Sequence, residues 1–204
     1  MKKCMFKSFI VLCCIIFLSS LCFSGCKSTI LPILNQNKVL QENIYKEYIN
    51  LGNAYFEIER YSDALKFYEK ALEDDNLYKV VCYKMAQCYI FLSDWENALA
   101  IYETILAEDP DNLSIKANIA YIYSVTGDFE EALFYYEDLL FAQPENITYL
   151  ENYLAIILSD VDILFDNEDI FVERFHKLKN EYPENKNIVI FQGKYDEYLE
   201  SFGN

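Results

Sequence analysis

The chain has 204 residues, of which 53% are hydrophobic and 25% charged, and it contains only five glycines and four prolines. This composition favours helices and is poor in the residues that make tight turns in a β protein. The formal net charge of −16 at pH 7 argues against nucleic-acid binding, because an acidic surface repels phosphate backbones. The acidity itself leaves two interpretations open: a basic partner, or a solvated exterior that keeps the protein soluble.

Residues 1–25 have the pattern of a secretory signal peptide, with a basic start followed by an uncharged, largely apolar run. The stretch FSGC at its end resembles the lipobox of bacterial lipoproteins, in which small residues precede a cysteine that becomes N-terminal and lipidated. This resemblance implies a lipid such as palmitate on Cys26, although Phe23 stands where leucine is usual. An uncleaved anchor is the alternative, since about 18 apolar residues can span a bilayer.

Both interpretations place the acidic body outside the bacterial inner membrane, because the N-terminal lysines remain on the cytoplasmic side. The expected location is the cell envelope, with the anchor in the inner or outer membrane and the body in the periplasm or at the cell surface. Residues 26–41 contain Pro32 and several polar side chains. We interpret them as a tether that precedes a folded domain over 42–204.

The folded domain begins with one pattern that occurs three times at an interval of 34 residues. Pro110 and Pro144 keep the same interval, at places where a helix must stop. The pattern resembles the tetratricopeptide repeat, a helix–turn–helix unit of 34 residues. The resemblance implies an all-α fold, a right-handed superhelical α-solenoid. Its columns are Gly52, Ala86 and Ala120; Tyr55, Tyr89 and Tyr123; Tyr61, Trp95 and Phe129; Ala64, Ala98 and Ala132; and Tyr68, Tyr102 and Tyr136.

The predicted units are 45–78, 79–112 and 113–146, followed by a degenerate unit at 147–185 and a capping helix at 187–201. In the third unit, Ile115, Ile119 and Ile122 fall on one stripe of the first helix, and Asp128 is placed to cap the second. The degenerate unit is longer by about five residues, which we place within 159–167. A terminal helix is expected because the last repeat of a solenoid needs a cover.

The tetratricopeptide resemblance implies that the first helices line a concave groove that binds a protein or peptide. Asn53 and Gln87 would supply donors and acceptors to an extended backbone, and Tyr83 and Tyr121 would supply rigid contact area. The alternative is that half of these side chains only pack against neighbours. A clamp for a chaperone's C-terminal carboxylate is excluded, because Ile49, Ser114 and Asn118 stand where basic residues are required. The groove rows are Asn53, Gln87 and Tyr121; Ile49, Tyr83 and Ala117; and Phe56, Ile90 and Ser124.

Two aromatic residues of the third unit do not belong to its core stripe. Phe134 and Phe141 are seven residues apart on the opposite side of the second helix, where the first unit has Lys66 and Glu73. An aromatic pair on a normally solvated convex face needs a cover. The segment VDILF at 161–165 would provide it from within the chain, and a partner protein is the alternative.

No residue pattern of an enzyme or metal site is found. His176 has no orienting partner in sequence, and Cys82 and Cys88 are too far apart on one helix for a disulfide, so we interpret them as buried free thiols. No cofactor is expected. The sequence predicts a membrane-anchored, non-enzymatic scaffold that binds proteins in the envelope, with complex assembly as one role. A small-molecule-binding accessory subunit of a solute transporter is the alternative.

Overall fold

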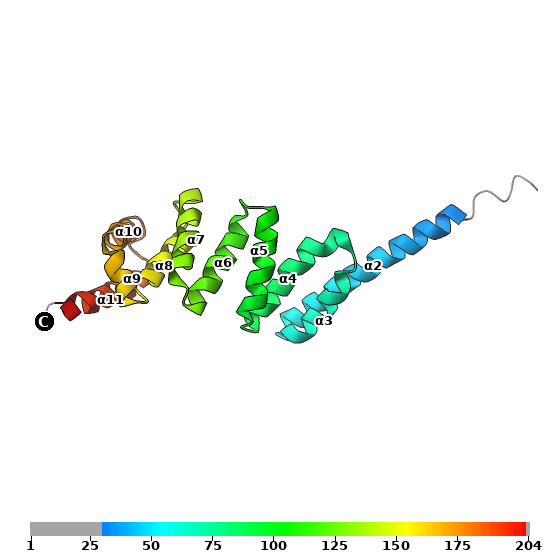
Figure 1. Cartoon of the computed structure of the whole chain (residues 1–204), viewed down its shortest axis with the longest axis horizontal. Helices are drawn as coiled ribbons and strands as arrows, with labels where there is room; N and C mark the ends of the chain where they lie inside the picture. Colours follow the sequence, from blue (N-terminus) through cyan, green and yellow to red (C-terminus); the bar gives the residue numbers. More distant parts are fainter. Residues whose placement is uncertain (1–29, 203–204) are drawn as a thin grey trace, which may run out of the picture.

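The computed structural model describes residues 30–202, which form a stack of helices with one short 3₁₀ turn and no strand in that range (Figure 1). The predicted all-α solenoid is confirmed, whereas the signal peptide and Cys26 lie outside the described residues. The elements are α2 (Ile30–Glu57), α3 (Tyr61–Ala71), η1 (Asp75–Leu77), α4 (Tyr78–Phe91), α5 (Trp95–Glu108), α6 (Leu113–Thr126), α7 (Phe129–Ala142), α8 (Ile147–Ile157), α9 (Val161–Asp166), α10 (Glu168–Glu181) and α11 (Asn187–Phe202).

The first helix is longer than the sequence suggests. It begins at Ile30, within the segment interpreted as a tether, and its N-terminal half extends away from the stack beyond α3 (Figure 1). Val39 and Leu40, on this extension, are 50% and 59% exposed. Pro32 is compatible with the helix because it lies in the first turn, where a backbone N–H has no partner in the helix. Within 30–202, no helix is both long and apolar enough to cross a bilayer.

Each predicted unit is one pair of packed helices: α2 with α3, α4 with α5, α6 with α7, and α8 with α10. Ala64, Ala98 and Ala132 are fully buried, and such small side chains let paired helices approach closely. The tyrosines four residues further on are also buried. The buried residues form three clusters that share half-buried Tyr89, Ile101, Tyr123 and Tyr135 at their borders, so one continuous core runs along the stack.

The turn within each of the first three units has one repeated geometry. Glu59, Ser93 and Gly127 all have positive φ, at 61°, 58° and 90°, and they are spaced by 34 residues like the other columns. The following residue donates its N–H to a carbonyl five residues back, as Asp128 does to Tyr123 at 2.9 Å. This left-handed residue ends the first helix and satisfies one of its free carbonyls.

Asp128 lies at the N-cap of α7 as predicted, but its carboxylate does not cap the helix. It accepts instead from the Thr126 hydroxyl at 2.8 Å. The corresponding Asp94 does cap its helix, by accepting from the Asn97 N–H at 3.4 Å. The prediction for Asp128 was therefore wrong, because a nearby hydroxyl competes for the same carboxylate.

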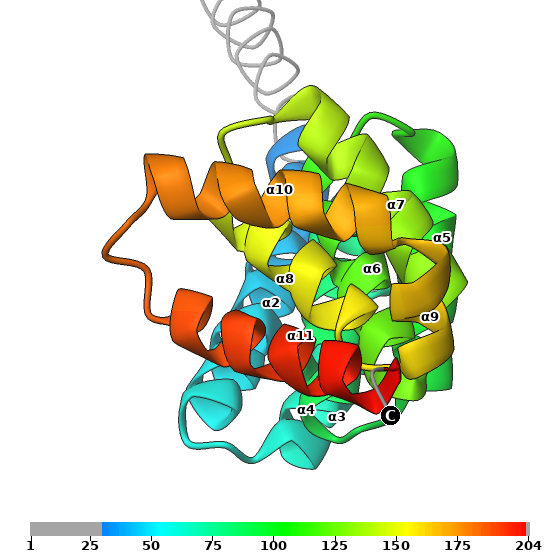
Figure 2. The same cartoon turned by 90° about the vertical axis from the view of Figure 1, so that its left-hand side faces the viewer.

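The C-terminal part closes the stack. The predicted insertion forms α9, and α10 and α11 lie on either side of α8 when the molecule is viewed from this end (Figure 2). Phe171 and Phe175 of α10 stack at 5.3 Å, and Phe191 of α11 meets Phe175 edge-on at 6.2 Å. These aromatic contacts hold the capping helix on the last unit, as predicted.

Candidate functional site

The predicted groove residues differ in how far they are available. Ile49 and Phe56 pack on the first core cluster, and Tyr83 and Ile90 pack on the middle one. Tyr83 also meets the Tyr102 ring edge-on at 5.9 Å. These residues therefore contribute to packing, which agrees with the alternative that part of the groove set is structural.

The more accessible part of the groove set lies on α6. Tyr121 is 44% exposed and meets the Trp95 ring edge-on at 6.3 Å. Half-buried Ser124 donates its hydroxyl to the Tyr121 carbonyl at 2.7 Å. Gln87 is half-buried on α4. A rigid tyrosine with a free edge is suited to contact a partner at low entropic cost.

The buried tyrosine column meets amide side chains at its hydroxyl end. The Tyr68 hydroxyl donates to Asn53 Oδ1 at 2.8 Å, and the Tyr136 hydroxyl accepts from Asn152 Nδ2 at 3.1 Å. The fully buried Tyr102 hydroxyl has no hydrogen-bond partner among the described residues, and burial raises its pKa. Asn53 is thus already used by the fold, although the groove prediction assigned it to a ligand.

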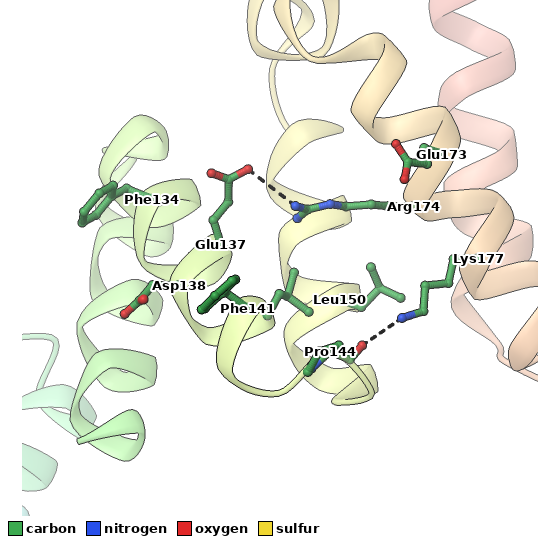
Figure 3. A pocket seen from close by; sticks show the side chains of 10 residues that line it. Phe134, Glu137, Asp138, Phe141, Pro144, Leu150, Glu173, Arg174 and Lys177 are labelled. Atoms are coloured by element: carbon green, nitrogen blue, oxygen red, sulfur yellow. Dashed lines mark hydrogen bonds and ion pairs between the residues drawn. The ribbon is translucent and has the colours of Figure 1, made fainter. Parts of the chain in front are cut away.

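A cleft of about 780 Å³ separates α7 from α10. Figure 3 shows Phe134 and Phe141 projecting from α7 on one side, with Arg174 and Lys177 from α10 on the other and Leu150 of α8 between them. Phe134 is 66% exposed and Phe141 is 88% exposed. The two aromatic residues that the sequence set apart therefore line the edge of a real depression.

The charged side chains of this cleft are only partly paired. The Arg174 guanidinium lies 4.0 Å from the centre of the Tyr153 ring, and its Nη2 is 3.5 Å from Glu137 Oε1. Its buried Nη1 has no acceptor among the described residues. Lys177 donates to the Pro144 carbonyl at 3.0 Å (Figure 3).

The predicted internal cover does not cover Phe134 and Phe141. The segment 161–165 forms most of α9, which packs on α10, while Phe141 is almost fully exposed. The reason is that Leu164 of α9 is buried in the C-terminal core, so this short helix is held next to α10. The alternative with an external partner is the one that the geometry leaves open.

Sequence reasoning missed the basic side of the cleft. Arg174 and Lys177 are one helical turn apart, and they follow a stretch from Met85 to Glu173 in which Lys116 is the only basic residue. That pattern could have indicated their importance. Their position opposite α7 could not have been found, because it depends on how α10 packs on α8.

The remaining reactive side chains have structural environments. Cys82 and Cys88 are buried free thiols, as predicted, and burial raises the pKa of Cys88 to about 11, which keeps it protonated and unreactive. His176 is exposed on α10. Within residues 30–202, no three His, Cys, Asp or Glu side chains are grouped to hold a metal ion.

Comparison with solved structures finds helical repeat proteins. A tetratricopeptide repeat protein from Parabacteroides merdae is 17% identical, with a TM-score of 0.68, over 79% of this chain and 62% of that protein. The chain thus spans less than two thirds of that protein's length. PilF of Pseudomonas aeruginosa is 19% identical, with a TM-score of 0.56, over 74% of this chain and 66% of its own. The first such domain of Spaghetti (RPAP3), bound to the HSP90 peptide SRMEEVD, is 21% identical, with a TM-score of 0.50, over 56% of this chain and 91% of its own.

Comparison of sequences gives the family. No curated protein matches the chain, but models of the tetratricopeptide repeat match residues 45–73 and 92–155. These ranges cover the first unit and most of the second and third, together with α8 of the degenerate unit. Such repeats generally serve as non-catalytic scaffolds for protein–protein interaction. The 34-residue columns, the helix pairs and the matching family models identify the chain as a tetratricopeptide repeat protein.

Proposed function

We propose that this protein is a membrane-anchored scaffold of the bacterial cell envelope, which holds a protein partner in the groove of its first helices and serves in the assembly of an envelope complex. The observation that carries the proposal is the solenoid itself, since stacked repeats present an extended binding surface. A structural neighbour was solved with a peptide bound. The N-terminal lipobox, with Cys26 as the lipidated residue, supports the anchor.

The partner is expected to contact α4 and α6. Tyr121 and Gln87 are the accessible members of the groove rows, and Tyr83 supports them from the core. A basic or neutral peptide suits this surface better than an acidic one, because Ile49, Ser114 and Asn118 supply no positive charge where carboxylate-binding repeats carry it.

The groove is tested by crosslinking the full chain to its neighbours in living cells. A photoreactive residue in place of Tyr121 is expected to give a discrete adduct with one envelope protein, and Tyr83→Ala is expected to weaken it. Lys66→Ala, at an exposed site on α3, is the control and should leave the adduct unchanged. A folded protein without any adduct at this site would count against the scaffold. Stabilisation of the same protein by a metabolite would then support the transporter-subunit alternative.

The anchor is tested separately by labelling cells with a fatty acid. The wild-type chain should incorporate the label, and Cys26→Ala should not, because the acyl chain attaches to that sulfur and its new N-terminus. Label that persists in Cys26→Ala would overturn the lipid assignment and favour an uncleaved N-terminal anchor.

A further inference from the structure

The surface between α7 and α10 has an apolar centre with an acidic and a basic edge. We call it the α7–α10 patch. Phe134, Phe141, Leu140, Pro144 and Leu150 make the apolar part, Glu137 lies on the α7 side, and Arg174 and Lys177 lie on the α10 side. Figure 3 shows this order across the cleft.

The apolar part of the patch is too exposed to be explained by the fold alone. The two phenylalanine rings are among the most exposed large side chains in the described part of the chain. Neither α9 nor α11 covers them. Large exposed aromatic surface next to a depression generally marks an interaction site.

The arrangement of charge selects the occupant. In a two-fold interface, each residue on one side meets the residue at the mirrored position of the other copy. If the two-fold axis runs along the cleft, Glu137 of one copy faces Arg174 and Lys177 of the other, twice. We propose that the α7–α10 patch binds the same patch of a second copy of this chain, with Phe141 of each copy entering the cleft of its partner.

The rest of the surface argues for the same orientation. Between Met85 and Glu173 the only basic residue is Lys116, and it is already paired with Asp138. Two copies that met through α5 or the outer side of α6 would bring acidic surfaces together, which opposes association. The α7–α10 patch is where this middle region meets cations of α10 that still have hydrogen-bonding capacity, since Arg174 Nη1 has no acceptor among the described residues.

The proposal does not depend on the groove, and its first test uses the full chain in cells. Two copies with different tags are co-expressed, and a photoreactive residue replaces Phe141 in one of them. The expected product carries both tags and has twice the mass of the chain. The same residue at Lys66 is the control and should give no such product. An adduct with a different protein would overturn the proposal and assign the patch to that partner. The absence of any adduct at position 141 would overturn it as well.

A charge exchange between copies tests the geometry. Glu137→Lys alone should weaken self-association by at least about tenfold, because lysine then faces Arg174 and Lys177 of the other copy. Lys177→Glu alone should weaken it in the same way. A mixture of the two variants should restore the doubly tagged product, since both pairs of facing charges are then opposite. Circular dichroism checks that each variant is folded. Failure of the mixture to recover would overturn the two-fold arrangement. Tyr83→Ala should leave the product intact, which separates this result from the function of the groove.

Discussion

Gly52 lies where α2 crosses α3, and its replacement by alanine is expected to destabilise the protein. A Cβ atom at this position would be 2.4 Å from Cε1 and 2.6 Å from Cδ1 of Tyr68. Ordinary carbon–carbon contacts are about 3.5–4.0 Å, so the ring would have to move by roughly 1 Å. Tyr68 has little room to do so, because it is 1% exposed and its hydroxyl is held by Asn53 at 2.8 Å.

The net cost of Gly52→Ala follows from two opposing effects. Overpacking a well-filled core costs about 1–3 kcal/mol, and loss of the Tyr68 hydrogen bond adds about 1 kcal/mol. Alanine returns about 1 kcal/mol, because it is the better helix former. The free energy of unfolding should therefore fall by about 1–3 kcal/mol. For a chain of this size the midpoint of thermal unfolding should fall by roughly 2–10 °C.

The assay is thermal unfolding of the full chain, followed by circular dichroism at the helix band. Gly193→Ala is the matched control. Gly193 lies inside α11, and nothing is found within 4 Å of its added Cβ, so the same change should raise the midpoint by roughly 1–4 °C. If Gly52→Ala also raised the midpoint, the close contact with Tyr68 would not limit the site, and the reasoning would be refuted. A second variant, Gly52→Ala with Tyr68→Leu, should lose less than the sum of its single changes.

Three further predictions concern the tyrosine column and the turns. Tyr68→Phe should cost about 1 kcal/mol in urea unfolding, whereas Tyr102→Phe should be neutral or stabilising, because the Tyr102 hydroxyl has no partner among residues 30–202; equal losses would contradict the assigned contacts. Burial raises the pKa of Tyr68 and of Tyr153 to about 12, so the stability linked to them is complete below the unfolded pKa of about 10 and is lost as the pH rises towards 12; a urea midpoint unchanged between pH 8 and 11 would contradict this. Gly127→Ala should destabilise by about 1 kcal/mol and Ser93→Gly should stabilise slightly, because both sites have positive φ; thermal midpoints that move the other way would show that the turns tolerate either residue.

The sequence predicts the fold well because the core is periodic. An interval of 34 residues places Ala64, Ala98 and Ala132 in the same environment three times, so each copy supports the assignment of the others. The left-handed turn position was missed for a related reason. Glu59, Ser93 and Gly127 share one backbone geometry but no side-chain chemistry, and only Gly127 indicates positive φ in a sequence. A column that is conserved in conformation but not in residue type can be found only in the structure.

The cleft between α7 and α10 shows a different limit. Phe134 and Phe141 could be set apart from sequence because their counterparts in the earlier units are not aromatic, and the prediction required only the local helical period. The side chains opposite them belong to the degenerate unit, whose inserted α9 breaks the 34-residue register. With the register lost, the positions of Arg174 and Lys177 relative to α7 depend on how α10 packs against α8. The same break explains why the depression occurs here: α10 is reached through an additional short helix, so its pairing with α7 is not a copy of the pairing between α5 and α7. A regular repeat would fill this space with the next second helix, and the irregular one leaves an apolar surface with charged edges that is available to a partner.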